Sequence, residues 1–350
     1  MVRRLAAVAL AFWTLGCATL EAVDQAAYES IPVNPVTGAL IFNVISEQTE
    51  IQQARDAWTQ LVAEAVEKGV AVDSPGSRLD RTRDAFGRLV GVAHRPSLPW
   101  EVHLVGVPVV NAFTPGGGMV IVFDGLFGGL IPAEDDDALA AVLAHEIAHV
   151  TLLHVPTRMT WSGLGPLVAK HAQDPYYQAA YTTEQEAEAD RLGVLYVALA
   201  GFDPMAAWRV WEEAHQRWGS SAAQQGSLQD HPLNAERMAG TRAAASLVQQ
   251  YEVSGAQNPA WETILADNVL FHRAAEVEYS PGAGLGRAIE AGGDTFVKHR
   301  QTKREEERRK AALQQLYQSI QVVRIFEAPT PDGHVGIFLD IHNGSGQEIQ

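Results

Sequence analysis

The stretch DALAAVLAHEIAHVTLLH, residues 137–154, decides the fold, because two histidines and a glutamate interrupt an otherwise apolar helical run. Four consecutive acidic residues, 134–137, precede the run after Pro132 and suit the positive end of a helix dipole. Leucine, valine, isoleucine and alanine then occupy nearly every face, so the sequence predicts a buried helix. Buried imidazoles and carboxylates are unfavourable unless they are paired or bind a metal. We therefore expect His145, Glu146 and His149 to be engaged with a partner.

The two histidines are spaced as a pair of metal ligands. At about 100° per residue, His145 and His149 lie roughly 40° apart on one face of a helix, with Glu146 beside them. This HExxH spacing predicts two zinc ligands and a glutamate that acts as general base on water. A structural pair of histidines without a metal is the alternative.

A catalytic zinc usually has a third protein ligand, which must come from elsewhere in the chain. Val155 stands where an HExxHxxGxxH pattern has its third histidine, and His154 is about 140° around the helix from His149, so we expect His154 to be an ordinary helix-end histidine. Glu186 and Asp190 lie four residues apart on a later predicted helix that Thr182 or Thr183 can cap. Like charges at this spacing repel unless a cation is near, so Glu186 is predicted as the third ligand and Asp190 as an acceptor that orients a ligand histidine. Two neighbouring carboxylates remain competitors for the third position: Glu184 and Glu188.

Composition bounds the function. The 350 residues are 47% hydrophobic, enough for one large core, or for a main domain with an appendage. The formal net charge of −16 excludes nucleic acid as an expected partner and offers no attraction to an anionic membrane surface.

The N-terminus reads as a targeting segment. Arg3 and Arg4 precede an apolar run over residues 5–15, which is too short to span a bilayer and has the layout of a secretory signal. Cys17, the single cysteine, ends a segment that resembles the lipobox of bacterial lipoproteins; an ordinary cleaved signal or a short anchor is the alternative. With Ala18 next, a lipidated Cys17 would resemble the outer-membrane-sorted class. No second membrane-spanning candidate follows, so we expect membrane contact through this lipid anchor only.

Strands are predicted between the N-terminal helices and the HExxH helix. Helices are expected near residues 46–66 and 78–92, followed by strands over 100–113 and 119–127. Glycines 116–118 form a tight turn between the strands. They are either architectural or leave room for an extended peptide to add to an edge strand beside the metal helix.

Seven segments, taken in order, resemble the M48 family of zinc metallopeptidases, most closely its soluble periplasmic lipoprotein members. They are NPVTG at 34–38, ISEQTEI at 45–51, NAFTPGGG at 111–118, LAAVLAHEIAHV at 139–150, EAEADRLG at 186–193, AGFDP at 200–204 and HPLNAER at 231–237. The resemblance implies a zincin-like α+β fold, mainly α-helical, with a small β-sheet or hairpin beside the active-site helix. It also implies that Glu186 is the third zinc ligand and that segment 111–118 borders the cleft, which makes the expected substrate-binding residues Asn111, Ala112, Gly116 and Gly117.

Two further residues follow from the same resemblance. By itself, the pair His231 and Pro232 would simply start a helix. The resemblance implies that His231 faces the zinc, either as a reversible fourth ligand or as a donor to the tetrahedral intermediate. Arg237 is expected to pair with a carboxylate such as Asp190.

The predicted organisation is a signal segment at 1–17, a metallopeptidase domain at 28–250 and a C-terminal segment at 251–350. The last contains helical stretches and then a hairpin formed by VVRIFEAP at 322–329 and VGIFLDIHNGSG at 335–346. The predicted function is a zinc-dependent endopeptidase of the bacterial envelope, facing the periplasm, with Glu146 as general base and polypeptides as substrates. The resemblance alone suggests that these are misfolded or assembling envelope proteins. The alternative is a non-proteolytic chaperone or assembly factor on the same fold.

Overall fold

The computed structural model describes residues 33–39, 41, 43, 45–160, 181–218, 231, 235–267 and 269–271, and the strand segments 320–329 and 335–343. The chain falls into two units, Met1–Gly293 and Asp294–Gln350. The predicted signal segment 1–17 and the lipidation candidate Cys17 lie outside the described residues.

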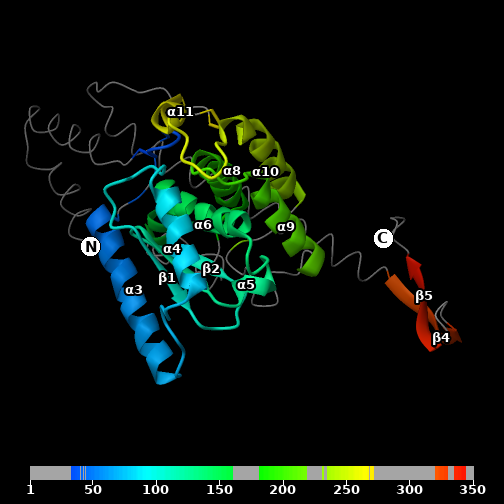
Figure 1. The fold of residues 1–350 in the computed structure, drawn as a ribbon. Coiled ribbons are helices and arrows are strands. Elements are labelled where there is room, and N and C mark those ends of the chain that lie inside the picture. The colour runs from blue at the N-terminus through cyan, green and yellow to red at the C-terminus, as the bar shows by residue number, and fades with distance from the viewer. Residues whose placement is uncertain are drawn as a thin grey trace, which may run out of the picture. The chain divides into compact units, whose positions relative to one another are not determined.

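Helices dominate the first unit (Figure 1), as predicted. Ser46 caps the first of them by accepting a hydrogen bond from the Thr49 amide, so the helix begins where the sequence predicted. The described helices are α3 (Glu47–Glu67), α4 (Ser77–Val90), the short α5 (Leu126–Gly129), α6 (Asp136–Thr151), α8 (Thr183–Leu199), α9 (Met205–Trp218), α10 (Ala235–Val248) and α11 (Trp261–Asp267), with a 3-10 turn at Gln249–Tyr251.

A small sheet lies beside these helices, with strand order β1-β3-β2. β1 (Glu101–Val105) pairs parallel with β3 (Met119–Phe123), and β2 (Ala112–Gly116) pairs antiparallel with β3, so β2 is an edge strand. The prediction of one strand over 100–113 is wrong, because the chain leaves the sheet between Val105 and Ala112. Pro108 has no amide to donate, and the backbone of Pro108 and Val109 instead packs within 2.7 Å of where a Cβ at Gly125 would lie.

Helix α6 is the centre of the core. Every residue from Ala138 to Thr151 is buried, and the helix packs against α4, α8, α9 and the edge strand β2. Gly193 of α8 allows the closest approach, because a Cβ there would stand 3.2 Å from the backbone nitrogen of His145. The packing of α8 on α6 therefore brings two sets of polar side chains together inside an apolar core.

The C-terminal end of α6 is sharply bent. Leu153 has φ of +60°, and a second helical segment, His154–Thr160, leaves at 52° to α6. Across the described part of the chain, no single helix has the length and apolar character needed to cross a membrane. α6 and the segment His154–Thr160 meet these two criteria only when they are counted together as one broken helix.

The second unit contains an antiparallel hairpin of β4 (Ile320–Pro329) and β5 (Val335–Asn343). The predicted C-terminal hairpin is therefore confirmed.

Candidate metal centre

Helix α6 presents the HExxH residues inside the core. Asp135 caps it by accepting from the Ala138 amide, and the motif lies in its last two turns. His145, Glu146 and His149 are each at most 3% exposed. Helix formation thus carries three ionisable side chains into the buried core.

Helix α8 supplies the facing carboxylates. Thr182, not Thr183, is its cap, and Gln185 completes a capping box by bonding back to the Thr182 amide. From this start, Glu186 and Asp190 lie one turn apart and are both buried.

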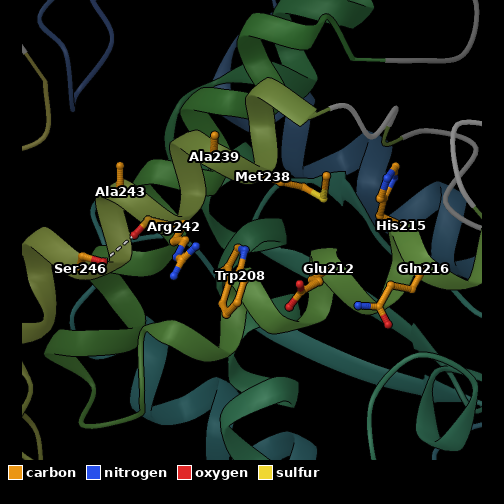
Figure 2. Close-up of a pocket in the computed structure, with 9 residues that line it drawn as sticks. All are labelled: Trp208, Glu212, His215, Gln216, Met238, Ala239, Arg242, Ala243 and Ser246. Atoms are coloured by element: carbon orange, nitrogen blue, oxygen red, sulfur yellow. Dashed lines mark hydrogen bonds between the residues drawn. The ribbon is translucent and has the colours of Figure 1, made fainter. Parts of the chain in front are cut away.

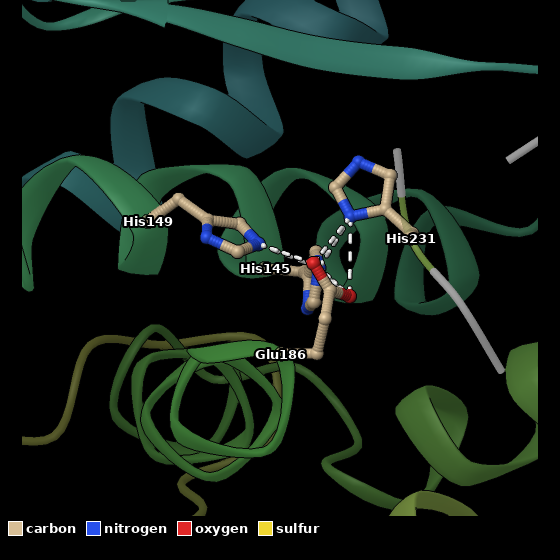
Figure 3. Close-up of side chains that lie close together, drawn as sticks. All are labelled: His145, His149, Glu186 and His231. Carbon is tan, nitrogen blue, oxygen red and sulfur yellow. Dashed lines mark hydrogen bonds and ion pairs between the residues drawn. The ribbon is translucent and has the colours of Figure 1, made fainter. Parts of the chain in front are cut away.

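Four side chains converge on one point (Figure 3). Ligand atoms of His145, His149, Glu186 and His231 all lie within 4.8 Å of one another. The Nε2 atom of His145 is 3.1 Å from Nε2 of His149 and 3.2 Å from Nδ1 of His231. Glu186 oxygens lie 3.1 Å from His231 Nδ1, 3.3 Å from His149 Nε2 and 3.5 Å from His145 Nε2. The competing residue Glu188 is not part of this group.

These separations fit a tetrahedral zinc ion. With Zn–N and Zn–O bonds of about 2.0–2.1 Å, the ligand atoms of a tetrahedron stand about 3.3–3.4 Å apart. The five distances given above, from 3.1 to 3.5 Å, bracket this value. Three imidazole nitrogens and a carboxylate are also the donor set that zinc prefers, so the residues present fit the ion that the HExxH spacing predicts.

His145 rests on a charged network. Asp190 Oδ1 lies 2.9 Å from its Nδ1 atom, and Arg237 donates to both Asp190 oxygens at 2.8 and 2.9 Å. The same guanidinium lies 2.7 Å from Glu186 Oε2, and Trp211 donates its indole N–H to Asp190 at 3.0 Å. Trp211 was missed in the sequence analysis, because nothing in the spacing of α9 separates it from a core aromatic residue.

His149 is held differently, and here a prediction is wrong. His154 does not point away from the pair: its Nδ1 atom lies 2.9 Å from Nδ1 of His149, and its Nε2 atom lies 3.2 Å from Glu188 Oε2. The bend at Leu153 ends the helix on which the 140° offset was based. Tyr181 stacks on the His149 ring at 3.7 Å between centroids. No sequence signal distinguished Tyr181, which stands just before the cap of α8.

Electrostatics differ among the four converging residues. Burial opposes protonation of His145, but its contacts with Asp190 and Glu186 outweigh burial and raise its pKa to about 10. Burial dominates at His149 and lowers its pKa well below the ordinary value. Burial also disfavours a charged Glu186, yet His231 and Arg237 hold its pKa well below the usual range. A divalent cation would therefore meet a carboxylate that is already ionised.

Glu146 lies next to His231 and is buried. Its Oε1 atom is 3.3 Å from Nε2 of His231, so His231 faces the converging ligands with one nitrogen and Glu146 with the other. Burial disfavours protonation of His231, but Glu186 and Glu146 together raise its pKa.

The predicted substrate-binding residues lie on and next to the edge strand. Asn111 precedes β2, and Ala112 and Gly116 are its first and last residues. Gly117 packs against α3: its amide donates to Glu50 Oε1 at 2.9 Å, and a Cβ there would stand 2.7 Å from the Ile51 Cα. Close packing against α3 therefore explains glycine at position 117. Strand β2, which packs beside α6, is still an edge strand of the sheet.

A separate pocket of about 550 Å³ lies between α9 and α10 (Figure 2). Its lining includes none of the four converging residues. It is built around the Arg242 guanidinium, which lies over the Trp208 ring at 4.6 Å. The remaining lining residues are Glu212, His215, Gln216, Met238, Ala239, Ala243 and Ser246.

Comparison with known proteins gives evidence that does not depend on the geometry of the site. A family model described as Peptidase family M48 matches residues 78–169 and 167–245. Mitochondrial metalloendopeptidase OMA1 of Schizosaccharomyces pombe is 28% identical over 218 residues, which cover 58% of this chain and 63% of that protein. The beta-barrel assembly-enhancing protease of Escherichia coli (strain K12) is 29% identical over 195 residues, covering 49% of this chain and 39% of that protein. The matches thus cover less than two thirds of each of these relatives.

Proposed function

We propose that this chain, which belongs to peptidase family M48 through residues 78–245, is a zinc-dependent endopeptidase with His145, His149 and Glu186 as its metal ligands. One observation carries the proposal: buried ligand atoms from two helices and from His231 converge with separations close to those of a tetrahedral zinc site. Asp190 and Arg237 support this set, since they hold His145 and Glu186 without reaching the metal position themselves.

Each residue has a chemical task in this proposal. Bound zinc lowers the pKa of water and polarises the scissile carbonyl. Glu146, one residue after a ligand on α6, takes the proton from the attacking water as general base and passes it to the leaving amine. The edge strand β2 packs against α6, so an extended polypeptide that adds to β2 runs beside the metal helix.

His231 decides whether the centre is open. Its Nδ1 atom lies 3.2 Å from His145 Nε2 and 3.1 Å from a Glu186 oxygen, which favours the fourth-ligand role. In that arrangement water reaches the metal only after His231 moves away. A His231→Ala variant that cleaves faster than wild type supports this role, whereas a variant that keeps zinc and loses turnover supports the donor role.

The substrates proposed are polypeptides of the bacterial envelope, with the chain facing the periplasm and anchored through a lipidated Cys17. The signal-like sequence of residues 1–17 and the similarity to a beta-barrel assembly-enhancing protease support this setting, while the mitochondrial relatives show that the family is not confined to it. A Cys17→Ser variant should shift from the membrane fraction to the soluble fraction.

The test of the function uses two variants. Glu146→Gln should keep zinc and lose cleavage of an unfolded protein substrate, and Glu186→Ala should lose zinc. Glu184→Ala is the matched control, because Glu184 is an exposed residue of the same helix. Undiminished zinc in Glu186→Ala would contradict the ligand assignment.

A second candidate function is a chaperone or assembly factor that holds clients without cutting them. The position of His231, which would close the metal site, favours it. Unchanged envelope function in Glu146→Gln bacteria would support this candidate over proteolysis, and clients trapped on that variant would identify the substrates.

A further inference from the structure

We propose that His154, held by Glu188, is a positioning residue that fixes the proton and the ring orientation of His149. The inference rests on the proposed metal centre, because it assigns a task to a side chain behind one of the ligands. A continuous helix would place His154 about 140° around its axis from His149.

The bend after α6 brings His154 into this position. Helix α6 ends at Thr151, and Leu153 adopts φ of +60°, a left-handed conformation that is unfavourable for a leucine. Asn34, 118 residues before Leu152, donates its side-chain amide to the Leu152 carbonyl at 3.1 Å and satisfies one carbonyl of the buried helix end. This bend places His154 beside His149, whereas a continued helix would have carried it to another face.

The hydrogen bonds behind His149 have only one consistent direction once its Nε2 atom binds a metal. Nε2 then uses its lone pair for the metal, so the proton of the neutral ring sits on Nδ1. That Nδ1–H donates to Nδ1 of His154, 2.9 Å away, which must carry the lone pair. His154 is then protonated at Nε2 and donates to the Glu188 carboxylate at 3.2 Å. Each ring nitrogen of His149 and His154 thus has a single role, and the series of hydrogen bonds ends at the Glu188 carboxylate.

The surroundings keep this arrangement in place. His154 is 3% exposed, and Tyr181 covers one face of the His149 ring. Glu188 belongs to α8, the helix that carries Glu186, so the bond from His154 joins the supports of two proposed ligands. Partners behind a metal-binding histidine orient the ring and raise its basicity, and their loss lowers metal affinity by about 10–100-fold.

The experiment measures zinc affinity of the full chain by chelator competition, and the visible spectrum of the cobalt-substituted protein. His154→Leu removes the acceptor and should weaken zinc binding by about 10–100-fold and change the cobalt spectrum. His154→Asn places an amide oxygen near the position of Nδ1 and should restore most of the affinity. His103→Asn is the matched control, because His103 also pairs with a carboxylate, Asp73 at 2.7 Å, but lies outside the centre.

Two outcomes would overturn the inference. Equal zinc affinity in wild type and His154→Leu contradicts it, while Glu186→Ala shows separately whether the metal centre itself exists. Nitrogen-15 spectra of the zinc-loaded wild type provide a second measurement that needs no folded variant. The expected His154 tautomer has its proton on Nε2; a proton on Nδ1 would refute the proposed direction.

Discussion

The two histidines of the HExxH motif lie one helical turn apart, yet the protein supports them in opposite ways. Behind His145 stands a buried charged network in which Asp190 meets Arg237, and the guanidinium also meets Glu186. Behind His149 stand an aromatic ring and a second imidazole, with a carboxylate only at the partly exposed end. The pKa of His145 is accordingly raised and that of His149 lowered.

The difference separates two physical tasks. A buried ion pair is unfavourable to break, because the remaining charge has no water to solvate it. A hydrogen bond between imidazoles carries less energy but fixes which nitrogen is free to bind a metal. We therefore expect damage on the His145 side to lower both stability and metal affinity, and damage on the His149 side to lower mainly metal affinity.

The largest effect is expected from Arg237→Met, which leaves two buried carboxylates, Asp190 and Glu186, without their cation. The free energy of unfolding should fall by about 3–5 kcal/mol, measured by urea denaturation. Arg242→Met, on the exposed face of the same helix, should change it by less than about 1 kcal/mol. Similar losses in both variants would show that the charged network has no special weight.

Asp190→Asn tests the metal-binding part of the His145 side. Zinc affinity should fall by about 10–100-fold, because an amide cannot supply the negative charge that orients His145. Combined with His154→Leu, the losses should add in free energy, since the two residues act through different histidines. A double variant no worse than either single one would mean that the two supports form one unit.

Acidification should weaken the contribution of Asp190 on the His145 side. Although burial opposes it, Arg237 and His145 lower the pKa of Asp190, so the folded state keeps this carboxyl ionised to lower pH than the unfolded state does. Its stabilisation is complete above the ordinary aspartate pKa of about 3.9 and is lost as pH falls through the lower folded value. Urea unfolding at a series of pH values from 7 to 3 should show a shallower decline in Asp190→Asn than in wild type; parallel curves would contradict this account.

The smallest effect is expected at the start of α8, which serves both sides because it carries Glu186, Glu188 and Asp190. Thr182→Ala removes the capping box and should cost about 1 kcal/mol of folding stability. Thr183→Ala is the control, since Thr183 is the first residue inside the helix and does not cap it. Equal urea midpoints for the two variants would exclude a capping contribution.

Much of the arrangement could be predicted locally. The helix start near Ser46, a threonine cap on α8, the buried character of α6 and the C-terminal hairpin follow from spacing and residue type, and the structure confirms them; it also selects Thr182 over Thr183 as the cap. One helical turn places His145 beside His149, and another places Glu186 beside Asp190. The two pairs face each other because α8 packs on α6. This packing is expected if Glu186 shares a zinc ion with the two histidines, as the resemblance to the M48 family implied.

The errors arose where distant parts of the chain decide the conformation. The supposed strand over 100–113 breaks because its middle packs against Gly125 and the sheet partner is β3. Gly117 packs so closely against the backbone of α3, some 65 residues earlier, that a Cβ would not fit. This packing explains the glycine at least as well as the need to leave room for a substrate does.

By itself, then, the sequence determined a buried helix with two histidines and a glutamate at HExxH spacing, and a carboxylate pair one turn apart on a later helix, because helical periodicity relates residues within a few positions. Only the tertiary structure decided how each histidine is supported. Leu153 takes a strained conformation, and Asn34 bonds to the neighbouring Leu152 carbonyl from 118 residues away. That bend turns His154 from a helix-end residue into the partner of His149, and no local pattern encodes it.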